Sequence, residues 1–496
     1  MKNADYGKLV DRLIELSYIG SAMAVLHWDQ EVHMPEKGSA MRAKTLGYMS
    51  GLLHDQFLAL NDKRMLDRLR KTVGTSKTPE GAVVRDILRA YDREKKLPKA
   101  FVEEMSVVCS EAQTVWAKAR EASDFAMFAP HLKKIVALKR KEAKLVGFTE
   151  SPYDALLDVY EPDMTSKRIT KLFDELKARL LPLIPKSGKP PTLPKGPYPI
   201  AAQRTFNELV AKTMGFDFDK GRLDISSHPF TIHFHPEDVR MTTRYREEDP
   251  MYSIGSTIHE TGHALYEQGL PIAHFGTALG ESISLGIHES QSRVWENIIG
   301  KSKGFWTYFY PHLQAAFPKQ LKKYSLDQFL AYVNHVVPSF IRTEADEVTY
   351  NLHVILRFEI EKDLIEGKIE VDELPAIWNA KMKDYLGVDV PNDRLGVLQD
   401  VHWSGGMIGY FPTYVLGNMY AAQFYDQAKK DIRGLEGLYA KGKLAPIREW
   451  LRQNVHIHGK RYSAEELVKK VTGKKLSAEP FASYLVKKYG SGKAAV

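Results

Sequence analysis

Apolar residues recur every three or four positions along most of this chain, which is the period of a helix with one buried face. In residues 4–20 the stripe consists of Leu9, Leu13, Ile14 and Leu16. The same pattern predicts further helices over residues 36–54, 79–96, 99–122, 128–145, 166–183, 280–300, 342–368 and 371–385, and in the region 419–489. The chain is therefore predicted to be mainly α-helical.

One region alternates instead. Thr231–His235 and Asp238–Arg244 have the period of a strand, and Pro236-Glu237 can turn the chain between them. This predicts a hairpin, and with it one small antiparallel sheet. His233 and His235 would share one face at a spacing that also suits a metal, but no further ligand cluster surrounds them, and half-exposed strand histidines need no special role.

Pro182–Pro199 is the clearest break in composition. Its prolines exclude regular helix or central strand, so we expect an extended connector or a surface loop. It separates a helical N-terminal region, residues 1–199, from a region that contains the candidate chemistry, residues 200–496. We expect the two to form one continuous folded unit. Residues 396–418 are rich in glycine and aromatic residues and are not expected to be regular throughout.

Composition changes this picture little. The single cysteine, Cys109, excludes an intramolecular disulfide and is typical of a reducing compartment, and no run approaches the ~20 apolar residues of a membrane span. The net charge is +8, yet the densest basic run, residues 133–144, has apolar residues at helical spacing, which is typical of a solvated helix face. We predict a cytoplasmic protein without a nucleic-acid or membrane partner.

The stretch Ser256–Glu267 contains the candidate chemistry. His259-Glu260-x-x-His263 is a two-histidine zinc motif, and four residues of helix point both imidazoles from one face. Glu260 lies about 100° round the helix, where a general base for the attacking water belongs. The alternative is a surface helix that contains such a pair by chance.

A catalytic zinc needs a third protein ligand. Glu289 follows His263 by 26 residues, which leaves room for a loop and a return helix, but Glu281 and Glu296 compete on spacing alone. A tyrosine hydroxyl or a histidine must also stabilise the developing oxyanion. The glycine-rich stretch offers the candidates Tyr410, Tyr414 and His402, for which aromatic core packing is the alternative.

Six motifs occur along the chain in a recognisable order. They are His228-Pro229-Phe230, Asp238-x-Arg240-x-Thr242, His259-Glu260-x-x-His263, His288-Glu289-Ser290-x-Ser292, Ile341-Arg342-x-x-Ala345-Asp346 and Gly396-x-x-Gln399-Asp400-x-His402-Trp403. Together with His27-Trp28-Asp29 they make the sequence resemble the carboxypeptidase Taq family of zinc carboxypeptidases.

The resemblance implies a helical, saddle-like fold around a deep groove, with residues 1–199 as one wall and the small sheet near the zinc. It also implies a homodimer, Glu289 as the third zinc ligand, and one Zn²⁺ per chain for which Co²⁺ can substitute. As the guanidinium that recognises a terminal carboxylate we select Arg342. A structural salt bridge is its alternative.

Arg240 is the second choice for that role, although it could pair with Asp238, and His228 is assigned to the substrate site as well. For the carboxylate that orients a zinc histidine, Asp346 and Asp400 are the candidates. The hypothesis is a zinc metallocarboxypeptidase that removes C-terminal residues from peptides with broad specificity, by Glu260-assisted attack of water. The alternatives are a helical zinc oligopeptidase that cuts inside short peptides and a non-catalytic scaffold.

Overall fold

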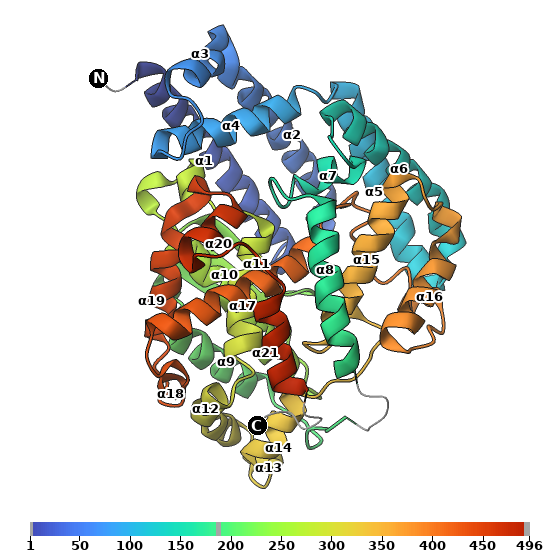
Figure 1. Ribbon diagram of the computed structural model, residues 1–496, viewed down its shortest axis with the longest axis vertical. Coiled ribbons are helices and arrows are strands. Elements are labelled where there is room, and N and C mark those ends of the chain that lie inside the picture. The colour runs from blue at the N-terminus through green and yellow to red at the C-terminus, as the bar shows by residue number, and fades with distance from the viewer. Residues whose placement is uncertain (1–2, 185–189, 491–496) are drawn as a thin grey trace. The chain divides into compact units, whose positions relative to one another are not determined.

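The computed structural model describes residues 3–184 and 190–490, and helices dominate it, as the hydrophobic pattern predicts (Figure 1). By spatial proximity the chain divides into two units, each assembled from three separate segments. Unit 1 takes its residues from 1–92, 192–330 and 421–475, and unit 2 takes its residues from 93–191, 331–420 and 476–496. Both units use chain from before and after residue 199, and the division into 1–199 and 200–496 stays a prediction.

Unit 1 contains the N-terminal helices and the helices around residue 260. Its helices are α1 (Ala4–Val32), α2 (Ser39–Leu58), α3 (Met65–Thr72), α9 (Ile200–Met214), α10 (Pro250–Gly269), α11 (Leu285–Arg293), the π-helical turn η7 (Val294–Ile299), α12 (Lys303–Ala316), α13 (Pro318–Leu321), α18 (Leu435–Tyr439), α19 (Ala445–Asn454) and α20 (Ala464–Thr472). The helices α4 (Pro79–Glu94), α14 (Leu326–Val333) and α17 (Pro412–Asp431) continue from one unit into the other.

Unit 2 is helical as well. Its helices are α5 (Lys99–Ala122), α6 (Phe125–Val146), α7 (Pro152–Leu157), α8 (Ser166–Leu180), α15 (Thr349–Glu366), α16 (Leu374–Leu386) and α21 (Glu479–Tyr489). The bounds of α5 are those predicted. In α6 the basic run, residues 133–144, buries Ile135, Val136 and Leu138, so the prediction of a helix face is confirmed.

Two of the helices that differ from their predicted bounds affect motif residues. The first predicted helix, 4–20, continues to Val32 and includes His27-Trp28-Asp29. The predicted helix 342–368 begins only at Thr349, because the Asp346 carboxylate accepts hydrogen bonds from the backbone amides of Val348 and Thr349 and caps that end. Arg342 therefore lies in a separate short turn, η8 (Arg342–Glu344), before the helix.

The sheet has three strands in the order β1-β3-β2. The predicted hairpin is confirmed as β2 (Thr231–His235) and β3 (Asp238–Thr243), which pair antiparallel with a register shift between His233 and His235. The expectation of a purely antiparallel sheet is wrong, because β1 (Gly221–Ile225) pairs parallel to β3. The sequence pattern missed β1, in which only one residue, Leu223, is buried.

The sheet positions α10. The central strand β3 buries Val239 and Met241, and the hydroxyl of Thr261 on α10 lies 3.5 Å from the sulfur of Met241. Thr243 in turn donates to the backbone carbonyl of Ser253, also on α10, at 3.2 Å. One end of the proline-rich connector is fixed nearby, where the amide of Tyr198 donates to the carbonyl of Glu247. The connector prediction also covers residues 185–189, which lie outside the described residues.

Within residues 3–184 and 190–490, no helix has the length and apolarity that crossing a membrane requires.

Candidate metal centre and active-site residues

Helix α10 presents both motif histidines. Its start is fixed by Asp249, whose side chain accepts from the amide of Met251, and by Pro250 in the first turn. Ile258, Ala264 and Leu265 are buried as predicted and anchor the helix from its other sides. Because His259 and His263 are four residues apart, their rings lie together, with centroids 4.8 Å apart.

Gly262 brings the next helix close enough to complete the cluster. A Cβ at this position would lie 2.6 Å from Cα of Ser292 and 2.7 Å from the carbonyl oxygen of Gln291. Only glycine allows the α11 backbone to approach α10 this closely. One turn earlier on α11, Glu289 is thereby held beside both histidines.

Three ligand atoms form a near-equilateral triangle. Nε2 of His259 and Nε2 of His263 are 3.2 Å apart, and Oε2 of Glu289 lies 3.7 Å from the first and 3.4 Å from the second. Bonds of ~2.0–2.1 Å to a tetrahedral zinc place neighbouring ligand atoms about 3.4 Å apart. His259, His263 and Glu289 therefore fit a zinc ion in both donor type and spacing.

The other two candidates for third ligand have different partners. Oε2 of Glu296 lies 2.7 Å from Nδ1 of His259, on the side of the ring away from the ligand nitrogen. Glu281 pairs with the ammonium of Lys460 at 2.6 Å. Glu296 therefore supports a ligand instead of serving as one.

Arg293 holds the carboxylates of this cluster. Its Nε donates to Oε1 of Glu289 at 2.6 Å, which leaves Oε2 for the metal, and its Nη1 donates to Glu296 at 3.1 Å. Burial opposes ionisation of Glu296, but Arg293 and His259 outweigh it and hold the pKa of Glu296 at about 2. Burial also disfavours a charged His259, yet Glu296 and Glu289 raise its pKa to about 9, so the surroundings favour a cation.

Glu260 is not one of the three residues whose ligand atoms cluster. It is 6% exposed, and its Oε2 accepts a hydrogen bond of 2.6 Å from the hydroxyl of Thr231 on β2. Burial raises the pKa of Glu260 above its ordinary value, although His259 and Thr231 oppose the shift. A buried carboxylate held by one hydroxyl is suited to accept a proton.

The partners of the two motif histidines are residues other than Asp346 and Asp400. Nδ1 of His259 is bound to Glu296, and Nδ1 of His263 contacts His288. Asp346 caps α15, and Asp400 pairs with arginines. That expectation was wrong because the supporting groups come from α11, which carries His288, and from the turn η7 after it, which carries Glu296.

In unit 2, Arg342 belongs to a buried group of charges. Its Nη2 lies 2.9 Å from Oδ1 of Asp400, and Nη2 of Arg357 lies 2.6 Å from Oδ2 of the same carboxylate. Arg342 and Arg357 are 6% and 0% exposed. Burial lowers the pKa of Arg357 to about 10, with Asp400 opposing and Arg342 adding to the shift. Two cations thus share one anion.

The oxyanion candidates gather in the same unit. Nε2 of His402 lies 3.2 Å from the hydroxyl of Tyr414, and the Tyr410 ring contacts both residues. Burial lowers the pKa of His402 to about 4, so its imidazole is neutral near pH 7. The guanidinium of Arg342 lies 4.8 Å from the Tyr414 ring. The three residues that the sequence selects are therefore neighbours of one another and of Arg342.

The remaining substrate candidates lie at the sheet of unit 1. Arg240 on β3 forms two hydrogen bonds of 2.9 Å with Asp238, and its guanidinium lies 4.3 Å from the Trp28 ring. Its pairing with Asp238 is the alternative that the sequence left open. His228 is exposed in the loop before β2, and its carbonyl accepts from Ser226 at 2.5 Å.

Sequence reasoning missed several residues around the centre. Two of them contact a candidate ligand, since Arg293 donates to Glu289 and His288 contacts His263. The other two are Thr231, which donates to Glu260, and Glu267, which contacts His288. Arg293 could have been found, because it follows Glu289 by four residues on the same helix face. Thr231 gave no such signal, because its contact depends on how β2 packs on α10.

Comparison with known proteins extends over the whole chain. Residues 8–489 match the family model described as carboxypeptidase Taq (M32) metallopeptidase. The chain is 42% identical to thermostable carboxypeptidase 1 of Thermus thermophilus, over 98% of this chain and 99% of that protein, and 41% identical to carboxypeptidase 1 of Bacillus subtilis, over 97% of each. A solved structure of Pyrococcus furiosus carboxypeptidase superposes with a TM-score of 0.95 at 38% identity, over 99% of both chains. The chain therefore belongs to the carboxypeptidase Taq (M32) family and is a metallocarboxypeptidase.

Proposed function

We propose that this enzyme uses zinc to release single residues from the free C-termini of peptides, with broad side-chain specificity. The observation that carries the proposal is the triangle of Nε2, Nε2 and Oε2 atoms on His259, His263 and Glu289, with edges of 3.2–3.7 Å. It offers two imidazoles and one carboxylate, the donor set of catalytic zinc in metallopeptidases, and three protein ligands leave one position open.

When bound, zinc would lower the pKa of a water molecule and polarise the scissile carbonyl. Glu260 would take the proton of the attacking water and later deliver it to the leaving amine. The hydroxyl of Thr231 fixes the Glu260 carboxylate, and burial raises its pKa, which favours uptake of the proton from the attacking water.

Recognition of the terminal carboxylate is proposed for Arg342. Within the group formed by Arg342, Arg357 and Asp400, two positive charges face one negative charge, so one positive charge remains uncompensated. A carboxylate is the natural anion for a buried guanidinium. We propose His402, Tyr410 and Tyr414 as candidates for stabilising the oxyanion, because a neutral imidazole and phenol hydroxyls can donate hydrogen bonds.

Arg240 and His228 are proposed as further substrate contacts at the sheet. In support, β2 lies at an edge of the sheet, and an edge strand can pair with an extended peptide backbone. The ion pair with Asp238 fixes the guanidinium of Arg240 and favours a role in shaping the site over binding a terminal carboxylate.

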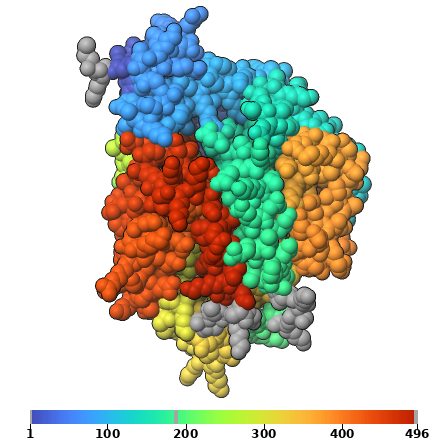
Figure 2. All heavy atoms as spheres, in the orientation of Figure 1, coloured from blue at the N-terminus to red at the C-terminus, as the bar shows by residue number. Residues whose placement is uncertain are grey.

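We also propose that the enzyme is a cytoplasmic homodimer. A stripe on α2 supports self-association, because Met41, Tyr48 and Leu52 are 70%, 77% and 40% exposed and recur at helical spacing. The N-terminal helices, blue in Figure 2, reach the molecular surface. Sedimentation of wild type and of Tyr48→Glu tests this, since a dimer formed through the stripe dissociates in the variant. A reducing compartment is favoured by the single cysteine, Cys109.

The deciding experiment is mass spectrometry of products from matched peptides with a free or an amidated C-terminus, with and without a chelator. We expect stepwise loss of single C-terminal residues from the free acid, little reaction of the amide, and none with the chelator. Internal fragments, or equal cleavage of the amide, would instead identify an oligopeptidase. Intact peptides in every reaction would favour a non-catalytic scaffold.

A further inference from the structure

A continuous line of contacts leads away from the metal centre through His263. Its Nδ1 meets Nδ1 of His288 on α11, and Nε2 of His288 lies 2.6 Å from Oε1 of Glu267 on α10. The other carboxylate oxygen of Glu267, Oε2, lies 3.3 Å from Nδ1 of His233 on β2. Three further side chains thus extend the coordination site by successive polar contacts.

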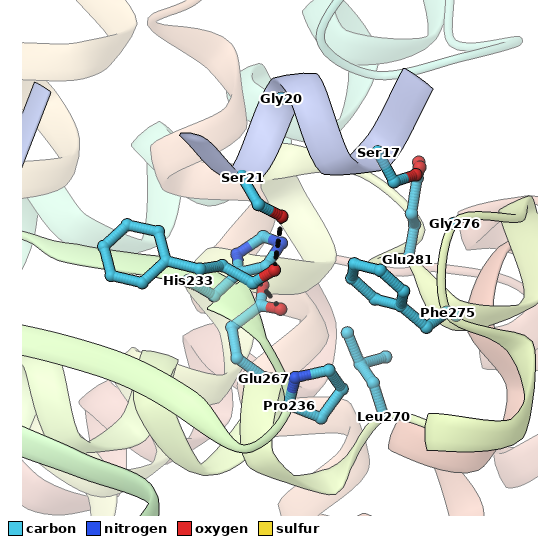
Figure 3. Close-up of a pocket in the computed structure, with 12 residues that line it drawn as sticks. Ser17, Gly20, Ser21, His233, Pro236, Glu267, Leu270, Phe275, Gly276 and Glu281 are labelled. Atoms are coloured by element: carbon cyan, nitrogen blue, oxygen red, sulfur yellow. Dashed lines mark hydrogen bonds and ion pairs between the residues drawn. The ribbon is translucent and has the colours of Figure 1, made fainter. Parts of the chain in front are cut away.

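The outer end of this line opens on a cavity of about 230 Å³ in unit 1. Figure 3 shows Glu267 and His233 side by side in its wall, with Ser17 and Ser21 of α1 opposite and Glu281 at another side. Glu267 is only 2% exposed, whereas the side chain of His233 is 46% exposed. The carboxylate is therefore enclosed, and the histidine beyond it reaches water.

Metal coordination fixes the direction of every hydrogen bond along the line. A neutral imidazole that binds through Nε2 carries its hydrogen on Nδ1, so His263 donates to His288. Nδ1 of His288 then accepts, its hydrogen lies on Nε2, and it donates to Glu267. Only an acceptor at Glu267 satisfies this order. Burial opposes ionisation of Glu267, but His233 and His288 outweigh it and lower the pKa of that carboxyl.

The two histidine ligands are thereby supported in parallel but unequal ways. Nδ1 of His259 is in direct contact with a carboxylate, because Oε2 of Glu296 lies 2.7 Å from it. His263 is linked to a carboxylate indirectly, because the imidazole of His288 lies between it and Glu267. Carboxylates in this position fix the tautomer and the ring orientation of a ligand and strengthen its bond to the metal.

We propose that Glu267, acting through His288, is a positioning residue that fixes the tautomer and orientation of His263, with His233 as the solvent-facing end of the same line. The inference rests on the zinc site proposed above. Its role is distinct from that of Glu260, because Glu267 holds a ligand and does not exchange a proton with the substrate.

Zinc affinity measured by competition with a chromophoric chelator tests the proposal. Removing such a support typically costs 10–100-fold in metal affinity, so we expect zinc to bind Glu267→Gln and His288→Leu at least tenfold more weakly than wild type. His288→Gln should restore part of the loss, because glutamine can both accept from His263 and donate to Glu267. The zinc affinity of His233→Gln should stay within about twofold of that of wild type, since the Glu267 carboxylate is unchanged in this variant.

Glu281→Gln is the matched control. It makes the same change in the wall of the same cavity, but Glu281 pairs with Lys460 outside the line of contacts. Its zinc affinity should equal that of wild type. Thermal unfolding of each metal-free variant shows whether a loss of affinity reflects a general loss of fold. Equal affinity of wild type and Glu267→Gln overturns the proposal.

A spectroscopic measurement separates the two supports. In the cobalt(II)-loaded protein, the Nδ1 hydrogens of His259 and His263 give separate exchangeable proton resonances. Glu267→Gln should shift the resonance of His263 and leave that of His259, and Glu296→Gln should do the reverse. If Glu267→Gln shifts neither resonance, or both equally, Glu267 is not the positioning residue of His263.

The two proposals fail separately. If wild type binds no zinc, the proposed zinc function fails, and this inference fails with it. If wild type binds zinc tightly and hydrolyses peptides while Glu267→Gln binds zinc equally well, only the present inference is overturned.

Discussion

The metal cluster of unit 1 and the arginine cluster of unit 2 are both buried groups of charges, but their charge balance is opposite. Around α10 and α11, the two carboxylates of Glu289 and Glu296 share the guanidinium of Arg293. In unit 2, Arg342 and Arg357 face the single anion Asp400. A buried charge needs a partner. The charge left after internal pairing has the sign that each proposed ligand requires, since a metal cation is proposed for one cluster and a terminal carboxylate for the other.

The largest expected effect is on kcat, when the proposed general base is removed and the metal ligands stay in place. Glu260→Gln keeps His259, His263 and Glu289 but removes the proton acceptor, so kcat should fall roughly 10³-fold while zinc remains bound. Steady-state kinetics and metal analysis of the purified variant measure both. Glu281→Gln serves as a control for the same substitution. A decrease in kcat of less than tenfold would exclude Glu260 as the general base.

The second prediction removes the uncompensated charge of unit 2. In Arg342→Ala the cations and anions of the cluster become equal, so kcat/KM for free-acid peptides should fall roughly 100-fold. Zinc affinity should not change, and Arg240→Ala should have a much smaller effect on kcat/KM. Thermal unfolding must accompany the kinetics, since Asp400 loses one partner. Loss of zinc in parallel with activity would mean that Arg342 is structural.

The third prediction concerns a buried carboxyl that belongs to neither cluster. Glu361 accepts hydrogen bonds from Trp403 Nε1, the Tyr153 hydroxyl and the Gly409 amide, and it thereby fixes the loop between His402 and Tyr410. Burial raises the pKa of Glu361 to about 7, against these three hydrogen bonds.

The folded pKa of Glu361 exceeds the unfolded value of about 4.5, so protonation stabilises the folded state. This contribution is complete below pH 4.5 and is lost as the pH rises towards 7. From pH 5.5 to 7 the free energy of unfolding should fall by about 2 kcal/mol more in wild type than in Glu361→Gln. Urea titrations at several pH values measure the difference. Parallel pH profiles would show that Glu361 is ionised throughout.

The smallest expected effect is on zinc affinity, when one of the carboxylates of the metal cluster is neutralised. Glu296→Gln keeps a hydrogen-bond acceptor at Nδ1 of His259 but removes one negative charge, so zinc should bind roughly tenfold more weakly. At saturating zinc, kcat should change far less than in Glu260→Gln. Chelator competition gives the affinity. An unchanged affinity would show that the excess of carboxylates does not contribute to metal binding.

The same comparison explains what could be predicted from sequence. The metal ligands depend on local spacing, four residues on one helix and one return helix, and the structure brings the expected residues together. Even so, spacing alone did not distinguish Glu289 from Glu281 and Glu296. The family motifs made that choice, because the approach of α11 to α10 depends on tertiary packing.

The arginine cluster could not be derived in this way. Arg342, Arg357 and Asp400 lie on a short turn, a helix and a loop, and no periodicity relates their positions. Arg357 was missed entirely, because on the fully packed helix α15 it occupies a position like those of its apolar neighbours. Strand β1 was missed for a related reason, since its pairing with β3 is visible only after the sheet has formed.

The close packing at Gly262 has a consequence for the choice of metal. Because a single methyl group there would collide with the α11 backbone, the distance between the two helices is set by van der Waals contact and not by the ion. The protein thus presents ligand atoms at a spacing determined before any ion arrives, and larger cations must distort two packed helices in order to fit. Engineering of metal selectivity in this enzyme should therefore begin with the helix spacing at residue 262, before any ligand is exchanged.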